Sequence, residues 1–237
     1  MELNEIYLGD AYELIKQVPD KSVDLIVTDP PYKFDGRHGK TSISCMGAYD
    51  EIDENGLGKG IDLSVLNEFD RVMKKTNIYL WCNKEQIYDY LTHYVKGKGC
   101  NFEVLIWAKN NPPPFTNGHY LKDKEYCLYF WEKGVKPKIT CERGKTVYVT
   151  SLNTYDKSRY LHPTIKPIEI IESLIRNSSS EGDVVMDPFV GSGTTALACK
   201  HLNRKWICFE IDEKYHRIAC DRLQGFDQKG GMSLLDL

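Results

Sequence analysis

The sequence lacks the spaced ligand pairs that hold a structural metal ion or a disulfide framework. Its eight cysteines include no C-x-x-C pair, and its six histidines include no H-E-x-x-H segment. Most of the cysteines lie in apolar stretches such as Ile207-Cys208-Phe209, where cysteine acts as a small core residue. We therefore expect neither a metal site nor disulfides.

Long apolar runs are also missing, since none reaches the roughly 18 residues that a membrane-spanning helix needs. The chain begins Met-Glu-Leu-Asn-Glu, without the basic and apolar blocks of a signal peptide. These absences predict a cytoplasmic protein that does not enter a membrane. A large net charge is lacking too, because 31 Lys and Arg stand against 34 Asp and Glu. The charge is sorted into blocks, however. Residues 133–166 hold eight cations and two acids, and such a block could meet phosphates.

Short apolar runs alternate with helical patterns along the 237 residues. Strands are predicted at 6–8, 23–28, 78–82, 102–107, 126–131, 184–186 and 206–209, with 102–107 and 126–131 as a hairpin pair. Residues 134–161 look less regular. Because most of the strands are uniformly apolar, they predict a largely parallel sheet with helices on both faces. Ligands bind such sheets at the carboxyl ends of the strands, where the strand order reverses.

A Gly-rich turn, Asp187-Pro188-Phe189-Val190-Gly191-Ser192-Gly193-Thr194, follows the predicted strand 184–186. Gly191 and Gly193 remove side chains where the backbone would approach a ligand, and a helix begins there. Glu210 ends the next strand, 17 residues after Gly193, where an acid can accept hydrogen bonds from both hydroxyls of a ribose. The pattern indicates an adenosine-containing cofactor but does not say which one.

The tetrad Asp29-Pro30-Pro31-Tyr32 follows the predicted strand 23–28. The two prolines hold φ near about −65° and contribute no N–H, so the Pro30 carbonyl and the Asp29 carboxylate are preorganised acceptors. Two acceptors can hold both protons of an amino group on a base and free its lone pair to attack. Tyr32 can stack on a base rotated out of a duplex. A dehydrogenase would share the Gly-rich turn and Glu210 but has no use for this tetrad.

These motifs, in this order, resemble the β class of DNA amino-methyltransferases, which form N6-methyladenine or N4-methylcytosine. The resemblance runs from about Ile6 to Leu223. It includes His162-Pro163-Thr164-Ile165-Lys166-Pro167, similar to the family's H-P-T-x-K-P segment, and Gly9-Asp10, similar to its adenine-contacting segment.

The resemblance implies one Rossmann-like α/β methyltransferase domain over residues 1–237. Its sheet would have seven mostly parallel strands with one antiparallel strand, and helices on both faces. Residues 1–133 would be the catalytic half and 162–223 the cofactor half. Residues 134–161 would form a small target-recognition segment, and 224–237 a tail.

The resemblance also implies the roles of single residues. Asp29, Pro30, Pro31 and Tyr32 would be catalytic, and S-adenosylmethionine would be the cofactor. Its adenine would meet Asp10, its ribose Glu210 and its carboxylate Lys166, while Asp187, Gly191 and Gly193 would surround its methionine end. Asp29, Phe189 and Thr194 complete the expected cofactor-binding residues. The methyl group would pass directly to the amino group, without a covalent intermediate and without a metal.

Double-stranded DNA is the expected partner. Six cations of the segment 134–161 are the expected DNA contacts, namely Lys136, Lys138, Arg143, Lys145, Lys157 and Arg159. Adenine N6 is the expected target, because cytosine enzymes often carry Ser at the position of Asp29. Methylation of cytosine N4, methylation of RNA, and a non-catalytic nucleic-acid-binding partner subunit stay open as alternatives. The resemblance also leaves a homodimer open, since β-class relatives are often dimers.

Overall fold

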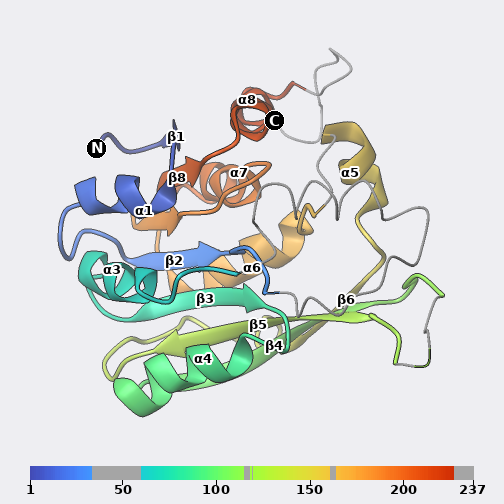
Figure 1. Cartoon of the computed structure of the whole chain (residues 1–237), viewed down its shortest axis with the longest axis horizontal. Helices are drawn as coiled ribbons and strands as arrows, with labels where there is room; N and C mark the ends of the chain where they lie inside the picture. The colour runs from blue at the N-terminus through green and yellow to red at the C-terminus, as the bar shows by residue number, and fades with distance from the viewer. Residues whose placement is uncertain (34–59, 115–117, 119, 161–163, 227–237) are drawn as a thin grey trace.

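Residues 1–33, 60–114, 118, 120–160 and 164–226 are described by the structure, a computed structural model (Figure 1). In this part of the chain, eight strands form one sheet in the order β1-β8-β7-β2-β3-β5-β4-β6. The strands are β1 (Glu5–Leu8), β2 (Leu25–Thr28), β3 (Asn77–Cys82), β4 (Asn101–Lys109), β5 (Lys124–Trp131), β6 (Val147–Thr150), β7 (Val184–Asp187) and β8 (Lys205–Glu210).

The strand directions confirm the predicted α/β class, with one difference in the number of strands. Strand β5 pairs antiparallel with both β3 and β4, whereas every other strand pair is parallel. The expectation of seven strands is wrong by one, because β6 forms in the segment that looks irregular in the sequence. This edge strand pairs with β4, and its residues alternate between exposed and half-buried. Four such residues give too weak a period to predict a strand.

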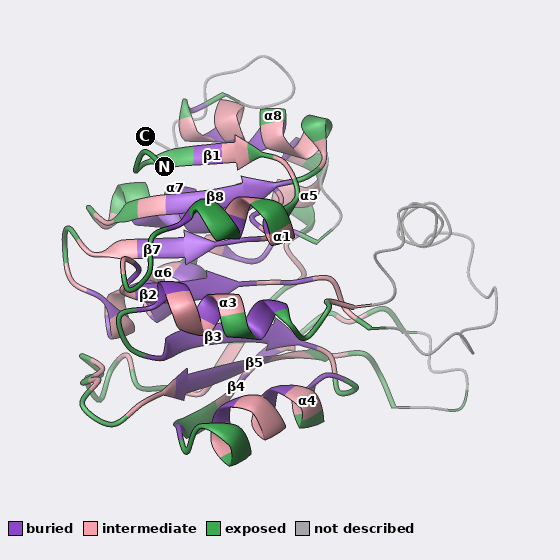
Figure 2. Ribbon diagram, turned by 60° about the vertical axis from the view of Figure 1, so that its left-hand side comes forward, coloured by how far each residue is buried: buried purple, intermediate pink, exposed green. Residues whose placement is uncertain are grey.

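The helices cover both faces of the sheet (Figure 2). Helices α1 (Ala11–Leu14), α3 (Val65–Val72) and α4 (Ile87–Leu91) contribute to the core on one face, and α6 (Ile168–Ser178) and α7 (Thr194–His201) to the core on the other. Helix α8 (Glu213–Leu223) packs against β1, and α5 (Thr154–Tyr160) follows β6.

Successive strand residues enter opposite cores, which explains why the central strands are apolar throughout. In β2, Ile26 packs on the α1–α3–α4 side, while Leu25 and Val27 pack on the α6–α7 side. All six residues of β3 are buried. A strand with two covered faces needs apolar side chains at every position.

The strand order reverses between β2 and β7. These strands are parallel neighbours, with Leu25 opposite Val185 and Ile26 opposite Met186. The chain passes from β2 to β3 on one side, and from β7 to β8 on the other. Asp29 follows β2, and Asp187 ends β7. The two motifs therefore meet at the switch point, as the family resemblance implies.

Candidate active site

Two carboxylates and two ammonium groups alternate beside the carboxyl end of β2. Lys166 Nζ contacts Asp29 Oδ2 and lies 3.1 Å from Glu125 Oε2. Lys109 Nζ lies 2.5 Å from the other oxygen of Glu125, Oε1. Lys109 comes from β4, Glu125 from β5, Lys166 from the loop before α6, and Asp29 from the loop after β2. The fold thus joins four separate parts of the chain in one charged row.

The charges in this row shift one another's pKa values. Burial raises the pKa of Asp29, and the ammonium of Lys166 opposes that rise. Burial also acts to raise the pKa of Glu125, but attraction to Lys166 and Lys109 outweighs it and lowers that pKa to about 2. For Lys166, the attraction of both carboxylates outweighs burial and raises the pKa above its ordinary value. Lys166 is therefore a cation, and its charge favours ionised Asp29.

Asp29 has one oxygen to offer to a substrate. Its Oδ1 atom is buried and has no hydrogen-bond partner among the described residues. Buried polar atoms without partners are uncommon and need an explanation. Here the atom lies at the switch point, where a ligand is expected, and an amino group of a substrate would satisfy it.

Tyr32 lies beside the same charged row. Its hydroxyl donates to Glu125 Oε2 at 3.4 Å, and its ring centroid is 5.6 Å from Lys166 Nζ. The turn itself is fixed by Gln86, whose side-chain amide donates to the Pro31 carbonyl at 3.1 Å. Pro30 is buried. The tetrad thus keeps a fixed backbone with an aromatic ring next to the Asp29 carboxylate.

Asp187 bonds to the protein through both of its oxygens. Oδ1 accepts from Thr28 Oγ1 at 2.7 Å and from the Phe189 amide at 3.1 Å, and Oδ2 accepts from Thr195 Oγ1 at 2.6 Å. Burial raises the pKa of Asp187 to about 6, against the effect of these hydrogen bonds. This carboxylate joins the end of β2 to the Gly-rich turn. The ring of Phe189 makes an edge contact with the ring of Tyr12 in α1, at a centroid distance of 6.4 Å.

Both glycines of the turn have a backbone conformation that favours glycine, and Gly193 also has a close neighbour that leaves no room for a side chain. Both have left-handed φ values, +54° at Gly191 and +82° at Gly193. A Cβ on Gly193 would lie 3.0 Å from Ala219 Cβ in α8. At Gly193 the neighbour that requires glycine is therefore another helix of the protein. Thr194, which begins α7, is buried and accepts a hydrogen bond from Arg222 at 2.9 Å.

Glu210 and Asp10 lie at the ends of neighbouring strands. The Glu210 carbonyl accepts from the Gly9 amide at 2.8 Å, and Asp10 caps α1 through the Tyr12 amide at 2.9 Å. The Glu210 carboxylate accepts from the amides of Gly191 at 2.8 Å and Asp212 at 2.9 Å. Burial raises the pKa of Glu210, while these two amides oppose the rise. Two acids with further lone pairs at one edge fit the hydroxyl and amino donors of a nucleoside.

The structure divides the expected DNA-binding segment between the two ends of the sheet. Because β5 runs opposite to its neighbours, the chain leaves it at the amino ends of the parallel strands. There the Lys138 amide donates to the Asn177 carbonyl at 2.6 Å, and Asn177 Nδ2 donates to the Arg143 carbonyl at 3.0 Å. Asn177 lies in the last turn of α6. Lys136, Lys138 and Arg143 therefore lie away from Asp29, and Lys145 leads from them into β6.

The other two cations lie on α5, which the chain reaches after β6 has returned to the carboxyl ends (Figure 1). Burial lowers the pKa of Lys157, Lys109 and Lys166 lower it further, and Glu125 opposes them. Lys157 therefore lies close enough to the charged row for the charges of Lys109, Glu125 and Lys166 to change its pKa. The Arg159 guanidinium lies 5.4 Å from the ring centroid of Tyr160. Of the H-P-T-x-K-P segment, His162 and Pro163 lie outside the described residues.

A pocket of about 400 Å³ at the amino end of the sheet is lined by Lys138, Arg143, Arg176 and Arg204, among others. Its cations have partners in the protein. Arg204 donates to the Ser179 carbonyl at 3.0 Å and to the Leu202 carbonyl at 2.5 Å, just past the C-terminal ends of α6 and α7. Cations are favourable at helix C-termini. At least part of the positive charge around this pocket is therefore explained by Arg204, which caps the C-terminal ends of two helices.

Sequence reasoning missed Glu125 and Lys109. Glu125 is an acid next to a predicted apolar strand, and this is a weak signal, because such a residue is more often a solvated strand end. Its importance appears only when the register of β4 and β5 places Glu125 opposite Trp107, two residues from Lys109.

Fold and site together define a Rossmann-like α/β protein with two acids, Asp10 and Glu210, at one edge of its sheet and a buried carboxylate oxygen without a described partner at the switch point. No helix in the described part of the chain could span a membrane, and no three of its described His, Cys, Asp or Glu residues are grouped to hold a metal ion.

Comparison with known proteins agrees with this class. A family model described as DNA methylase, of the N6 and N4 type, matches residues 23–221. The type II methyltransferase M.HpaI of Haemophilus parainfluenzae is 31% identical over 252 residues, covering 92% of this chain and 75% of the relative. M.HinfI of Haemophilus influenzae is 32% identical over 249 residues, covering 94% and 68%. The crystal structure of the M1.HpyAVI–SAM complex aligns with a TM-score of 0.69 at 27% identity, covering 92% of this chain and 98% of that one.

The chain belongs to the N6/N4 DNA methylase family. Its activity is DNA methylation, and S-adenosylmethionine is its cofactor.

Proposed function

We propose that this enzyme methylates the exocyclic N6 of an adenine rotated out of double-stranded DNA, in the cytoplasm. The observation that carries the proposal is the buried, unpartnered Oδ1 of Asp29, located where β2 and β7 diverge. A buried acceptor without a partner in this place suits an amino proton of a base.

When bound, S-adenosylmethionine would supply a methyl group from its positively charged sulfur: the S–C bond would break as the N–C bond forms, leaving neutral S-adenosylhomocysteine, and the amino nitrogen would release one proton to solvent. Asp10 and Glu210 would hold the adenosine part at the ends of β1 and β8. Asp187, Phe189, Gly191, Gly193 and Thr194 would shape the turn beside the methionine part. The contacts of Lys166 with Asp29 and Glu125 support a role at the acceptor rather than at the cofactor carboxylate.

The residues of the chain prepare the amino group for attack. Asp29 Oδ1 and the Pro30 carbonyl would accept its two protons, and the Tyr32 ring would stack on the base. The backbone of Pro30 and Pro31 is fixed before the base arrives. Rate enhancement then comes from preorganised acceptors and from the alignment of the two reacting atoms.

We propose that DNA lies across the carboxyl end of the sheet, against α5. Lys157 and Arg159 would contact phosphates there, within the segment 134–161 assigned to target recognition. The proposal keeps one methyltransferase domain, with residues 1–133 as the catalytic half and 162–223 as the cofactor half. A homodimer is proposed from the family resemblance alone, and sedimentation at micromolar concentration would measure it.

Analysis of methylated nucleosides tests the proposed target. DNA incubated with the enzyme and isotopically labelled S-adenosylmethionine is digested to nucleosides and examined by mass spectrometry. We expect label in N6-methyladenine, and none with the Asp29→Ala variant. Label in N4-methylcytosine would assign the alternative base instead. Folded, cofactor-binding protein that labels no DNA would favour a partner subunit without its own catalysis.

A further inference from the structure

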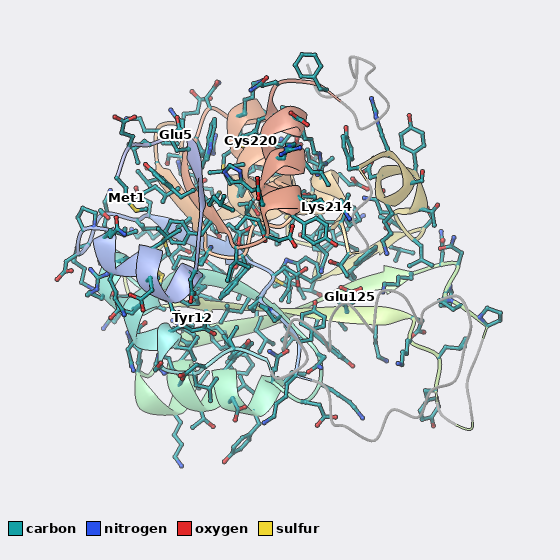
Figure 3. All side chains as sticks on the ribbon, turned by 45° about the horizontal axis from the view of Figure 1, so that its top comes forward. Met1, Glu5, Tyr12, Glu125, Lys214 and Cys220 are labelled. Atoms are coloured by element: carbon teal, nitrogen blue, oxygen red, sulfur yellow. The ribbon has the colours of Figure 1, made fainter. Side chains whose placement is uncertain are left out.

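Glu125 is the one group in the described charged row that bonds to three side chains from three other parts of the fold. Oε1 accepts from Lys109 at 2.5 Å, and Oε2 accepts from Lys166 at 3.1 Å and from the Tyr32 hydroxyl at 3.4 Å. Its side chain is 21% exposed. Figure 3 labels Glu125 toward the end of the sheet at which β2 and β3 finish.

Lys166 acts on Asp29 in two opposing ways. Its ammonium holds Oδ2 and favours the ionised carboxylate. The same positive charge opposes the charge that arrives on the amino nitrogen as the methyl group leaves sulfur. A second carboxylate bound to Lys166 offsets this repulsion without occupying Asp29 Oδ1. Glu125 is such a carboxylate, and its contact with the Tyr32 hydroxyl also holds the ring that would stack on the base.

We propose that Glu125 is a positioning residue: it holds Lys166 on Asp29 Oδ2, offsets the charge of Lys166, and orients Tyr32, so that Asp29 Oδ1 can stabilise the positive charge developing on the target nitrogen. This inference rests on the proposed function, in which Asp29 accepts a proton of the amino group.

The effect of removing the negative charge of Glu125 on the rate should depend on whether Lys166 is present. This dependence distinguishes the proposed role from that of a structural ion pair. With Lys166 present, loss of the negative charge at position 125 leaves an unopposed cation beside Asp29. With Lys166 replaced by methionine, Glu125 only repels the Asp29 carboxylate and favours its protonation. Removing the charge of Glu125 should therefore slow transfer in the first background, and should leave it unchanged or accelerate it in the second.

Single-turnover methyl transfer, with saturating S-adenosylmethionine and DNA, measures this dependence. The variants are Glu125→Gln, Lys166→Met and the double variant, and Glu103→Gln removes the same charge from an exposed position on β4. Loss of one preorganised electrostatic contact slows catalysis about 10²–10³-fold. We expect roughly 10–100-fold for Glu125→Gln, because it acts through Lys166. Glu103→Gln should stay within about twofold of the wild-type rate, and the affinity of Glu125→Gln for S-adenosylmethionine should be unchanged.

The pH profile of the same rate gives a second readout. The groups that act on Asp29 are Lys166, Glu125 and Tyr32, and Asp187 at the end of β7 is close enough for Asp29 to raise its pKa. Glu125 raises the pKa of Asp29 and Lys166 lowers it. The acidic limb, where Asp29 becomes protonated, should therefore move to lower pH in Glu125→Gln and to higher pH in Lys166→Met. A merely structural loss would reduce the rate and leave the acidic limb of each variant where it is in the wild type.

Any of three results would overturn the inference. They are a Glu125→Gln rate within about twofold of wild type, an equal loss of rate from Glu125→Gln with Lys166 and with Lys166→Met, and an acidic limb of the pH profile that does not move in either single variant. Should Glu125→Gln fail to fold, Glu125→Asp keeps the charge on a shorter side chain and should give an intermediate rate. Asp29→Ala separates the two proposals. An active Asp29→Ala enzyme would refute the acceptor role of Asp29 on which the proposed function rests, whereas an inactive one together with a fully active Glu125→Gln enzyme would refute only the role of Glu125.

Discussion

Two sets of cations in the segment 134–161 lie at opposite ends of the sheet, and DNA binding should depend on one set only. The perturbations are the paired variants Lys157→Ala with Arg159→Ala, and Lys136→Ala with Lys138→Ala. Each pair removes two positive charges, so the change in net charge is matched. Only the first pair lies on α5, at the end of the sheet where Asp29 follows β2.

The expected magnitude follows from counterion release. Each phosphate contact contributes about 0.9 to the slope of log K against log salt. Two lost contacts should reduce the slope by roughly 1.8, and raising salt from about 50 to about 200 mM separates variants that differ this much by about tenfold. Neutralising Lys136 and Lys138 should leave the slope within about 0.5 of wild type, because Lys138 bonds to Ser180 at the amino end of the sheet.

Fluorescence anisotropy with a labelled duplex, measured over a series of salt concentrations, gives both slopes. The affinity for S-adenosylmethionine should be the same in all variants, which checks that each protein is folded. An equal loss of slope in the two paired variants would mean that DNA reaches both ends of the sheet. A loss confined to Lys136 and Lys138 would place the duplex on the opposite edge and refute the proposed orientation.

The remaining predictions concern the turn, the cofactor edge and the ring. Gly193→Ala should lower the free energy of unfolding by about 1–2 kcal/mol from its left-handed backbone, and further from the contact with Ala219; Gly182→Ala has the same φ of +82° and open space, so equal losses in denaturant titrations would refute the packing role. Glu210→Ala should weaken S-adenosylmethionine binding by roughly 1.5–3 kcal/mol in calorimetry, and unchanged affinity would remove Glu210 from the site. Tyr32→Ala should lose a stacking contribution of about 1–3 kcal/mol in DNA-saturated turnover, while Tyr32→Phe loses only the hydroxyl contacts with Glu125 and Asp29; equal losses would assign the role to the hydroxyl.

Local apolar patterns were enough to predict most of the strands, whereas the place of the switch point between β2 and β7 was implied by the family resemblance. The central strands are buried on both faces, so their uniform apolarity shows in a short window of sequence. Asp29 and Asp187 follow such strands directly, and their proximity follows from the order of parallel strands. Glu210 and Asp10 are brought to one edge by the same rule.

What the sequence did not predict depends on pairings between distant segments. Strand β6 is stabilised by its pairing with β4, not by a marked pattern of its own. The separation of Lys138 from Lys157 follows from the reversed direction of β5. The role of Glu125 depends on partners 16, 41 and 93 positions away, Lys109, Lys166 and Tyr32. No window of sequence contains them together.

The hydrogen bond of 2.7 Å between Thr28 and Asp187 has a consequence for the accuracy of methyl transfer. Thr28 is covalently joined to Asp29, and Asp187 is joined through Pro188 to the turn beside the expected methyl donor. The spacing of the two reactants is therefore set by strand pairing inside the core, where neither side can shift alone. An error of 1 Å in such an arrangement can cost about 10²-fold in rate. Asp187 can thus affect the rate of the reaction through this spacing, in addition to its proposed place beside the methionine part of the cofactor.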